Sequence, residues 1–344
     1  MADRTLTINH ADGGSETYTL KTEDVLGVRS MQVDGETVTV DRTAPDLVRT
    51  IIADGQTITI DTTREGVRTL TVDGTEITLD HTEEANLNSF LEQFTGASAA
   101  YSLRDLASIS GDTTVVRVRR SSDNAEADFS AKEVSDGTLV TWVGAGNDGF
   151  VETWYDQSGN GNDAVQEVAG SQPKIVDAGV LVSGGIEFDG VDDRFVFSAG
   201  RPITSIDAAS AFFVGSSDSS ANQCGLFLSS ASTSKRFYFP VLNSGIFKFG
   251  YANNISAVIL ASPDTSEHIF TGIAGASTAS GYYDGELKGI AASGTGVSGG
   301  QNIGSIGTGY RWDGRMREII IYPSDQSANR EAIETNINNQ YDIY

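Results

Sequence analysis

The sequence predicts a mainly β protein in two parts: a row of β-hairpin repeats, then an antiparallel β-sandwich with a short C-terminal helix. Three observations favour this fold class. The first 80 residues repeat themselves around hairpin turns, the remainder alternates short apolar runs with polar turns, and the 344 residues include 38 glycines but only 6 prolines. Glycine, serine, asparagine and aspartate suit the tight turns that join many short strands.

Three gap-free copies of one pattern begin at Val28, Val48 and Val67, and a looser copy surrounds Asp12. Each copy has two alternating runs about an Asp-Gly pair, which favours a type I′ hairpin because both turn residues take positive φ. The three pairs are Asp34-Gly35, Asp54-Gly55 and Asp73-Gly74. One hairpin cannot bury its own apolar face, so residues 1–82 are predicted to anchor the chain and to join it into a homo-oligomer, most plausibly a trimer.

Residues 83–96 predict a linker helix, because the apolar residues at 87, 90, 91 and 94 recur at helical spacing before Gly96. Residues 97–344 predict the sandwich, with strand-like runs such as TVVRVRR, LVTWVG, FVETWY, AFFVGS and REIIIYP separated by polar turns. Ser327 to Asn338 predicts the closing helix. Ser327 is its expected N-cap, and its apolar face comprises Ala328, Ala332, Ile333 and Ile337.

Composition excludes several classes of function. The formal net charge of −24 repels phosphate backbones, so no nucleic acid partner is expected. The single cysteine, Cys224, excludes an intrachain disulfide, and the three histidines have no metal-ligand spacing. No apolar run is long enough to span a membrane and the first residues are polar, which predicts synthesis in a host cytoplasm without a signal peptide.

Two polar turns could hold a ligand. In YDQSGNGND, Asp156 and Asn160 either cap backbone groups of the turn, the favoured interpretation, or supply oxygen ligands to calcium or a sugar. In FDGVDD, Asp189, Asp192 and Asp193 present the same alternatives. We therefore expect no metal and no cofactor, with Asp156, Asn160, Asp189 and Asp192 as weak calcium candidates.

Four segments carry a resemblance to a known family. They are AYSLRDL with VVRVRRSSDNAEADF, TWYDQSGNGNDAVQ, IEFDGVDDRF and REIIIYPSDQSANREAIETNINNQY. Over residues 97–344 the chain resembles the catalytic domain of the α-L-arabinofuranosidase B family, which implies a concanavalin A/laminin-G-like sandwich, or jelly roll. It is also similar to bacteriophage virion proteins, in which such a sandwich sits on a separate anchoring region.

The resemblance also implies where the catalytic residues should lie. The family's nucleophile glutamate falls at Ala252, its acid/base aspartate falls at Thr308, and its paired cysteines are reduced to Cys224 and Gly225. The carboxyl pair that hydrolysis requires is thus missing at the matched positions, which predicts a non-enzymatic, catalytically inactive sandwich. Asp313 and Glu318 remain as alternative carboxylates.

These observations predict a virion surface protein of a phage, either a capsid decoration or a head fibre or spike. Its repeats bind other virion proteins and its sandwich faces host glycans. One alternative is a tail or baseplate receptor-binding protein. Another is an active arabinofuranosidase-like hydrolase that cuts host surface polysaccharide. Aromatic and polar side chains near strand ends suit sugar binding. The glycan-binding candidates are Tyr251, Asn253, Tyr310, Trp312 and Asp313.

Overall fold

A computed structural model describes the backbone of eight strands before residue 88 and then residues 88–229, 236–251, 254–275, 277–292, 301–307 and 309–344. At Tyr251 and over residues 254–257 it describes the backbone alone. The chain divides into two compact units, Met1–Leu87 and Asn88–Tyr344, which we call unit 1 and unit 2. Each unit is described by itself.

Unit 1 consists of antiparallel hairpins in two four-stranded sheets, ordered β2-β1-β8-β7 and β3-β4-β5-β6. In each repeat two residues separate the paired strands, since Val33 pairs with Glu36, Ala53 with Gln56 and Val72 with Thr75. The hairpin strands are therefore confirmed, while the Asp-Gly pairs lie outside the described residues. The strands are β1 (Arg4–Asn9), β2 (Ser15–Leu20), β3 (Val28–Val33), β4 (Glu36–Asp41), β5 (Val48–Ala53), β6 (Gln56–Asp61), β7 (Arg68–Val72) and β8 (Thr75–Leu79).

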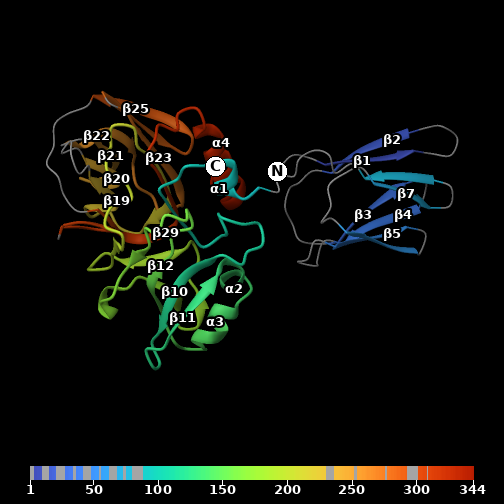
Figure 1. The fold of residues 1–344 in the computed structure, drawn as a ribbon, viewed down its shortest axis with the longest axis horizontal. Coiled ribbons are helices and arrows are strands. Elements are labelled where there is room, and N and C mark those ends of the chain that lie inside the picture. Colours follow the sequence, from blue (N-terminus) through green and yellow to red (C-terminus); the bar gives the residue numbers. More distant parts are fainter. Residues whose placement is uncertain are drawn as a thin grey trace. The chain divides into compact units, whose positions relative to one another are not determined.

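Unit 2 is a β-sandwich, as predicted, and Figure 1 shows its strands with α2 and α3 beside β10 and β11. Its helical segments are α1 (Phe90–Gln93), α2 (Ala131–Ser135), α3 (Thr138–Val143), the 3₁₀ turn η1 (Ala169–Ser171) and α4 (Arg330–Tyr341). Its strands are β9 (Ala99–Ser102), β10 (Thr114–Arg120), β11 (Glu126–Ser130), β12 (Gly149–Trp154), β13 (Ala164–Val165), β14 (Lys174–Asp177), β15 (Val180–Leu181), β16 (Ile186–Asp189), β17 (Phe195–Phe197), β18 (Ser210–Ser217), β19 (Gln223–Ser229), β20 (Arg236–Asn243), β21 (Ile246–Tyr251), β22 (Asn254–Ala261), β23 (His268–Ala274), β24 (Thr278–Tyr283), β25 (Glu286–Ala292), β26 (Asn302–Ile303), β27 (Ser305–Ile306), β28 (Tyr310–Arg311) and β29 (Asp313–Tyr322).

Two strand runs form the layers of the sandwich. In one layer β18 pairs with β23 on one edge and with β29 on the other, and β24 and β25 continue beyond β23. In the other layer β17, β26, β19, β20, β21 and β22 pair in that order. All of these pairings are antiparallel, and β13 links the second layer to β12 through its pairings with both β12 and β17.

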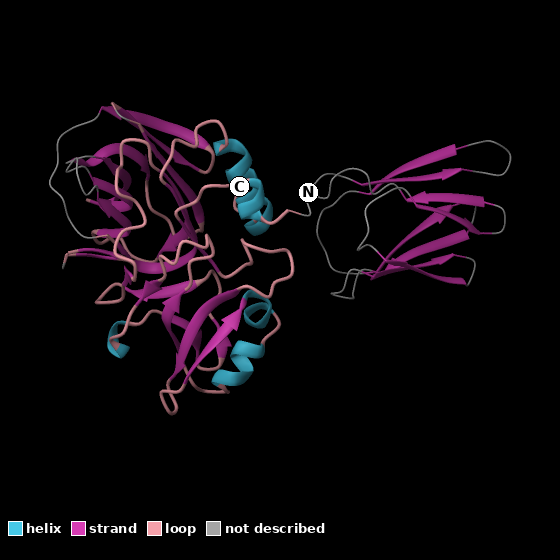
Figure 2. Cartoon of the chain, viewed as in Figure 1, coloured by secondary structure: helices cyan, strands magenta, loops and turns pink. Residues whose placement is uncertain are grey.

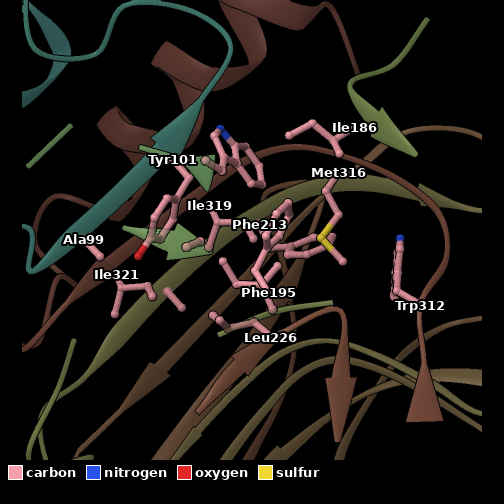
Figure 3. Packing of buried hydrophobic residues seen from close by; sticks show 14 of the residues in the cluster. Ala99, Tyr101, Ile186, Phe195, Phe213, Leu226, Trp312, Met316, Ile319 and Ile321 are labelled. Carbon is pink, nitrogen blue, oxygen red and sulfur yellow. The ribbon is translucent and has the colours of Figure 1, made fainter. Parts of the chain in front are cut away.

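Aromatic rings from both layers fill the core. Phe270 of β23 packs edge-on against Phe239 of β20 and Phe247 of β21, with ring centroids 6.3 and 5.0 Å apart. Phe213 of β18 packs at 5.3 Å on Trp312, and Figure 3 shows these two residues among the buried side chains. Such tilted pairs add to the stabilisation from apolar burial.

One predicted strand is wrong. LVTWVG forms most of α3, which follows α2 closely, and both helices lie beside β10 and β11 (Figure 2). Ser130 and Glu133 make a capping box that starts α2, and Leu139 and Val143 of α3 are buried at i, i+4 spacing. The sequence LVTWVG predicts a strand because its apolar residues also fit the two-residue period of a strand. A run this short does not distinguish that period from the 3.6-residue period of a helix.

The two predicted helices at the ends of unit 2 are present with different bounds. Within the predicted linker helix, α1 covers only Phe90–Gln93, capped by Ser89. At the C-terminus α4 begins after Asn329 rather than after Ser327. Its Ile333 and Ile337 are buried, but Ala328 and Ala332 are exposed. Among the described residues, no helix has the length and apolar character that a membrane crossing requires.

A buried ion pair ties β29 to the segment after β9 and to α4. Glu318, only 1% exposed, accepts hydrogen bonds from Arg104 Nε at 2.7 Å and Arg104 Nη2 at 2.8 Å. The hydroxyls of Ser102 and Tyr341 donate to the same carboxylate. Burial alone lowers the pKa of Arg104, but the charge of Glu318 and its hydrogen bonds more than offset that effect, so the guanidinium stays charged. The carboxylate of Glu318 therefore holds β29, the segment after β9 and α4 together.

The Arg104→Met variant should lose about 3–5 kcal/mol of unfolding free energy, because it leaves a buried carboxylate without its cation. Replacing both residues, as Arg104→Met with Glu318→Leu, should recover most of that loss. Urea denaturation followed by tryptophan fluorescence measures both changes. The matched control is Arg117→Met, whose partner Asp128 is exposed and which should cost less than about 1 kcal/mol. A similar small loss for Arg104→Met would contradict this account.

Candidate functional site

The polar loop after β12 is organised by the side chain of Asp156. Its Oδ1 accepts from the backbone amides of Ala100 and Ser158, and its Oδ2 accepts from the Ser158 hydroxyl and the Asn162 amide. Asn160 donates its side-chain amide to the carbonyl of Ala97. Both calcium candidates in this loop thus hold the loop and the start of β9 together, and both oxygens of Asp156 have donors.

The positions that the arabinofuranosidase resemblance assigns to catalysis lie outside the described residues. They are Ala252 and Thr308, together with the glycan-binding candidate Asn253. Tyr251 is the last residue of β21, and only its backbone is described. Cys224 is a buried free thiol, and burial raises the pKa of that thiol well above its usual value.

The structure brings together three carboxyl groups in the turn between β16 and β17. One oxygen each from Asp189, Asp192 and Asp193 lies within 4.8 Å of the others, and we call this set the aspartate cluster. Asp189 Oδ1 accepts from the backbone amides of residues 191, 192 and 193, while the amide of Asp189 donates to Asp193 Oδ2. The cluster runs from Asp189, which is exposed, through Asp192 to Asp193, which is 6% exposed.

Burial changes the acidity of one member of the aspartate cluster. Desolvation, and then the nearby charge of Asp189, raise the pKa of Asp193 to about 7. Near neutral pH this carboxyl group therefore holds a proton in a substantial fraction of molecules. A carboxylic acid poised near the working pH is the usual requirement for a general acid.

Asp313 lies beside the aspartate cluster. It is the Cα partner of Asp189 in the β16–β29 ladder, and burial raises the pKa of its carboxyl group as well. Gly190 makes this approach possible: its φ is +72°, and a Cβ atom there would lie 2.7 Å from Asp313 Cβ. Only glycine fits both conditions.

Two aromatic glycan candidates lie in different environments. Tyr310 is partly exposed, accepts a hydrogen bond from Asn243 Nδ2 and packs against a second apolar cluster that includes Phe227 and Tyr238. Trp312 is fully buried in the main core against Phe213, so neither face of its indole is open to a sugar ring. The sequence offers Asp193 only as a turn residue or a calcium ligand, because its burial, which depends on the tertiary packing around the turn, cannot be predicted from the sequence.

The fold defines the class of the protein: a mainly antiparallel β-sandwich. No family model matches the sequence, and no curated protein matches it. Among solved structures, a GH54 α-L-arabinofuranosidase soaked with a cyclic sulfate inhibitor matches with a TM-score of 0.50 at 16% identity, over 70% of this chain and 62% of that one. This likeness shows the fold, and the chain spans less than two thirds of that enzyme.

Two other solved structures have lower TM-scores. An arabinofuranosidase complexed with arabinofuranosyl-α-1,2-xylobiose matches with a TM-score of 0.47 at 16% identity, again over 70% of this chain and 62% of that one. Trypanosoma rangeli sialidase in complex with sialic acid matches with a TM-score of 0.39 at 12% identity, over 90% of this chain and 53% of that one.

The match with a TM-score of 0.50 corrects the prediction of a non-enzymatic, catalytically inactive sandwich. That solved structure is a glycoside hydrolase, so the fold is one that a hydrolase also has. The prediction depended on the family-matched positions 252 and 308, with Asp313 and Glu318 as alternative carboxylates. The described part of the chain places Asp189, Asp192 and Asp193 together elsewhere on the sandwich.

Unfolding free energy should depend on the protonation of Asp193. The pKa of Asp193 is about 7 in the folded chain and about 4 when unfolded, so the folded state binds the proton more tightly. Stability should therefore fall as pH rises between about 5 and 7, by up to about 1.4 kcal/mol per pH unit from this group. Asp193→Asn should flatten that slope.

Urea denaturation at half-unit pH steps measures the effect. The control is Asp177→Asn, which removes an exposed acid paired with Lys174 and should leave the slope unchanged. An identical slope in the wild type and in Asp193→Asn would show that Asp193 does not bind a proton in this range.

Proposed function

We propose that the chain is a glycoside hydrolase that cuts a surface polysaccharide, with the aspartate cluster supplying its catalytic carboxyl groups. One observation carries this proposal: Asp193, whose pKa is raised to about 7, lies with a partly exposed second aspartate inside a 4.8 Å cluster. Glycoside hydrolysis needs such a pair, one carboxyl group that donates a proton and one that acts as a carboxylate.

The roles follow from the partners of each side chain. Asp193 is the general acid, because burial keeps its proton. Asp192 is the nucleophile: its Oδ2 accepts from the Ser171 hydroxyl, whereas Asp189 Oδ1 is occupied by three backbone amides of the turn. A separation below 5 Å is closer to that of retaining enzymes than to the 6.5–9.5 Å or so of inverting ones.

In this mechanism Asp192 attacks the anomeric carbon as Asp193 transfers its proton to the departing glycosidic oxygen. Asp193, now a carboxylate, then takes a proton from water, which attacks the glycosyl–Asp192 ester. The sugar leaves with its anomeric configuration retained, and both carboxyl groups return to their starting state.

Purified full-length chain should release 4-nitrophenol from at least one member of a panel of aryl glycosides that includes the α-L-arabinofuranoside. Asp193→Asn should lower kcat about 100-fold or more, since general acid catalysis contributes at least that factor, and Asp177→Asn should not. The wild-type rate should decline above about pH 7 as Asp193 loses its proton. No release from any glycoside of the panel, or full activity in Asp193→Asn, would overturn the proposal.

We also propose that unit 1 joins copies of the chain. Among the described strands of unit 1, those at the ends of each sheet pair on one edge only, namely β2 and β7 in one sheet and β3 and β6 in the other. Open edges of this kind pair readily with other strands. Placement on a virion surface, with other virion proteins as partners, stays a prediction that electron microscopy of intact particles would test.

Light scattering of the eluting full-length chain should give a whole-number multiple of the chain mass, three if the trimer prediction holds. The mass should not change between micromolar and nanomolar loading if the edges pair tightly. A monomer at every concentration would contradict assembly through unit 1.

A further inference from the structure

The short hairpin β27–β28 carries buried polar atoms that have no partner. Arg311 Nε and Nη1 and Ser305 Oγ are buried without a hydrogen bond. Ser305 and Arg311 are Cα partners in the hairpin, so their side chains leave the same face about 5 Å apart. Buried donors without acceptors are costly, which makes this face a place where an acceptor would be bound favourably.

A second arginine lies next to this hairpin. The charge of Arg194 acts on Arg311, and together with burial, the larger effect, it lowers the pKa of the Arg311 guanidinium. Gly304, at the base of the hairpin, comes so close to Arg194 that a Cβ atom at position 304 would lie 3.4 Å from its Cα. Two guanidinium groups packed near each other favour an anion between or beside them.

The aspartate cluster is near but does not pair with these arginines. The charges of Asp189 and Asp192 act on Arg311, yet no ion pair within 4.0 Å joins Arg311 or Arg194 to any carboxylate in the part of the chain that the structure describes. Arg194 Nη1 reaches only the backbone carbonyl of Asp192, at 3.4 Å. The guanidinium of Arg311 therefore keeps its capacity for a ligand beside the proposed catalytic acids.

We propose that Arg311 and Ser305, with Arg194 beside them, bind the carboxylate of an acidic sugar, so that the substrate class is a uronic-acid-containing polysaccharide. The proposal rests on the proposed hydrolase function. The Nε and Nη1 atoms of Arg311 lie on different edges of the planar guanidinium, so a carboxylate accepts from one of them, and the Ser305 hydroxyl supplies a second donor. This contact orients the sugar ring next to Asp192 and Asp193.

The overall charge of the chain shapes the choice of probe. A formal charge of −24 repels a long polyanion at low ionic strength, whereas a single uronate is affected much less. Binding is therefore measured with D-galacturonate and D-glucuronate, by calorimetry on the full-length wild-type chain. D-galactose and D-glucose are the neutral counterparts, and inorganic sulfate and phosphate are the competing anions.

One of the two uronates should bind at least about tenfold more tightly than its neutral counterpart. Arg311→Met should remove that difference, Arg311→Lys should restore part of it because the charge returns without the planar guanidinium, and Arg117→Met should match the wild type. Near-ultraviolet circular dichroism identifies any variant that has not folded. Equal binding of acidic and neutral sugars, tighter binding of sulfate or phosphate than of either uronate, or an unchanged preference in folded Arg311→Met would each overturn the proposal.

Asp193→Asn separates this inference from the proposed function. It should keep the uronate preference while losing hydrolysis of aryl uronides. Uronate binding by a wild-type chain that hydrolyses no glycoside would overturn the hydrolase and leave the carboxylate site standing. Hydrolysis of neutral glycosides without any uronate preference would overturn the carboxylate site alone.

Discussion

The close packing of β29 against its neighbours is the constraint on which the rest of unit 2 depends. Along one edge β29 pairs with β18, and along the other it pairs with β16 near residue 314 and with β9 near residue 320. Gly185 and Gly314 permit this, because a Cβ atom on either would lie 2.2 Å from a backbone oxygen of the adjoining strand, and both have positive φ. The strand carries Glu318 toward Arg104 at one place and Asp313 toward the aspartate cluster at another.

Much of the fold could be predicted from local patterns. Alternation of apolar and polar residues located most strands of the sandwich, and self-similarity located the hairpins of unit 1. The prediction of a strand at LVTWVG is wrong because its secondary structure depends on the burial of Leu139 and Val143. The local sequence does not show that burial. The sequence also placed the closing helix, but not its start, since Asn329 and Ser327 are both acceptable residues near an N-terminus.

The site was less predictable because it depends on contacts between distant segments. In FDGVDD the sequence singles out Asp189, Asp192 and Asp193 as turn residues or calcium ligands. What distinguishes Asp193 is burial, and what distinguishes Arg311 is the absence of an acceptor, and neither property can be read from spacing. The indole of Trp312 shows the converse: an aromatic residue beside polar ones suggested a sugar platform, but the turn directs it into the core against Phe213.

In the proposed mechanism, the protonation of Asp193 links catalysis to stability. The burial that raises the pKa of its carboxyl group to about 7 also makes the folded state less stable as pH rises towards that value, since the ionised form is then forced into an apolar setting. An asparagine at position 193 would accept the same backbone hydrogen bond from Asp189 without that penalty. Asparagine at position 193 would pack as well as aspartate. An aspartate is expected at such a position when its proton takes part in a reaction. The unpaired guanidinium of Arg311 fits the same logic, because an apolar residue there would leave no donor unsatisfied. The buried carboxyl group of Asp193 in the β16–β17 turn and the unpartnered atoms of Arg311 in the β27–β28 hairpin each lower the stability of the fold. A ligand that binds both groups would offset both losses.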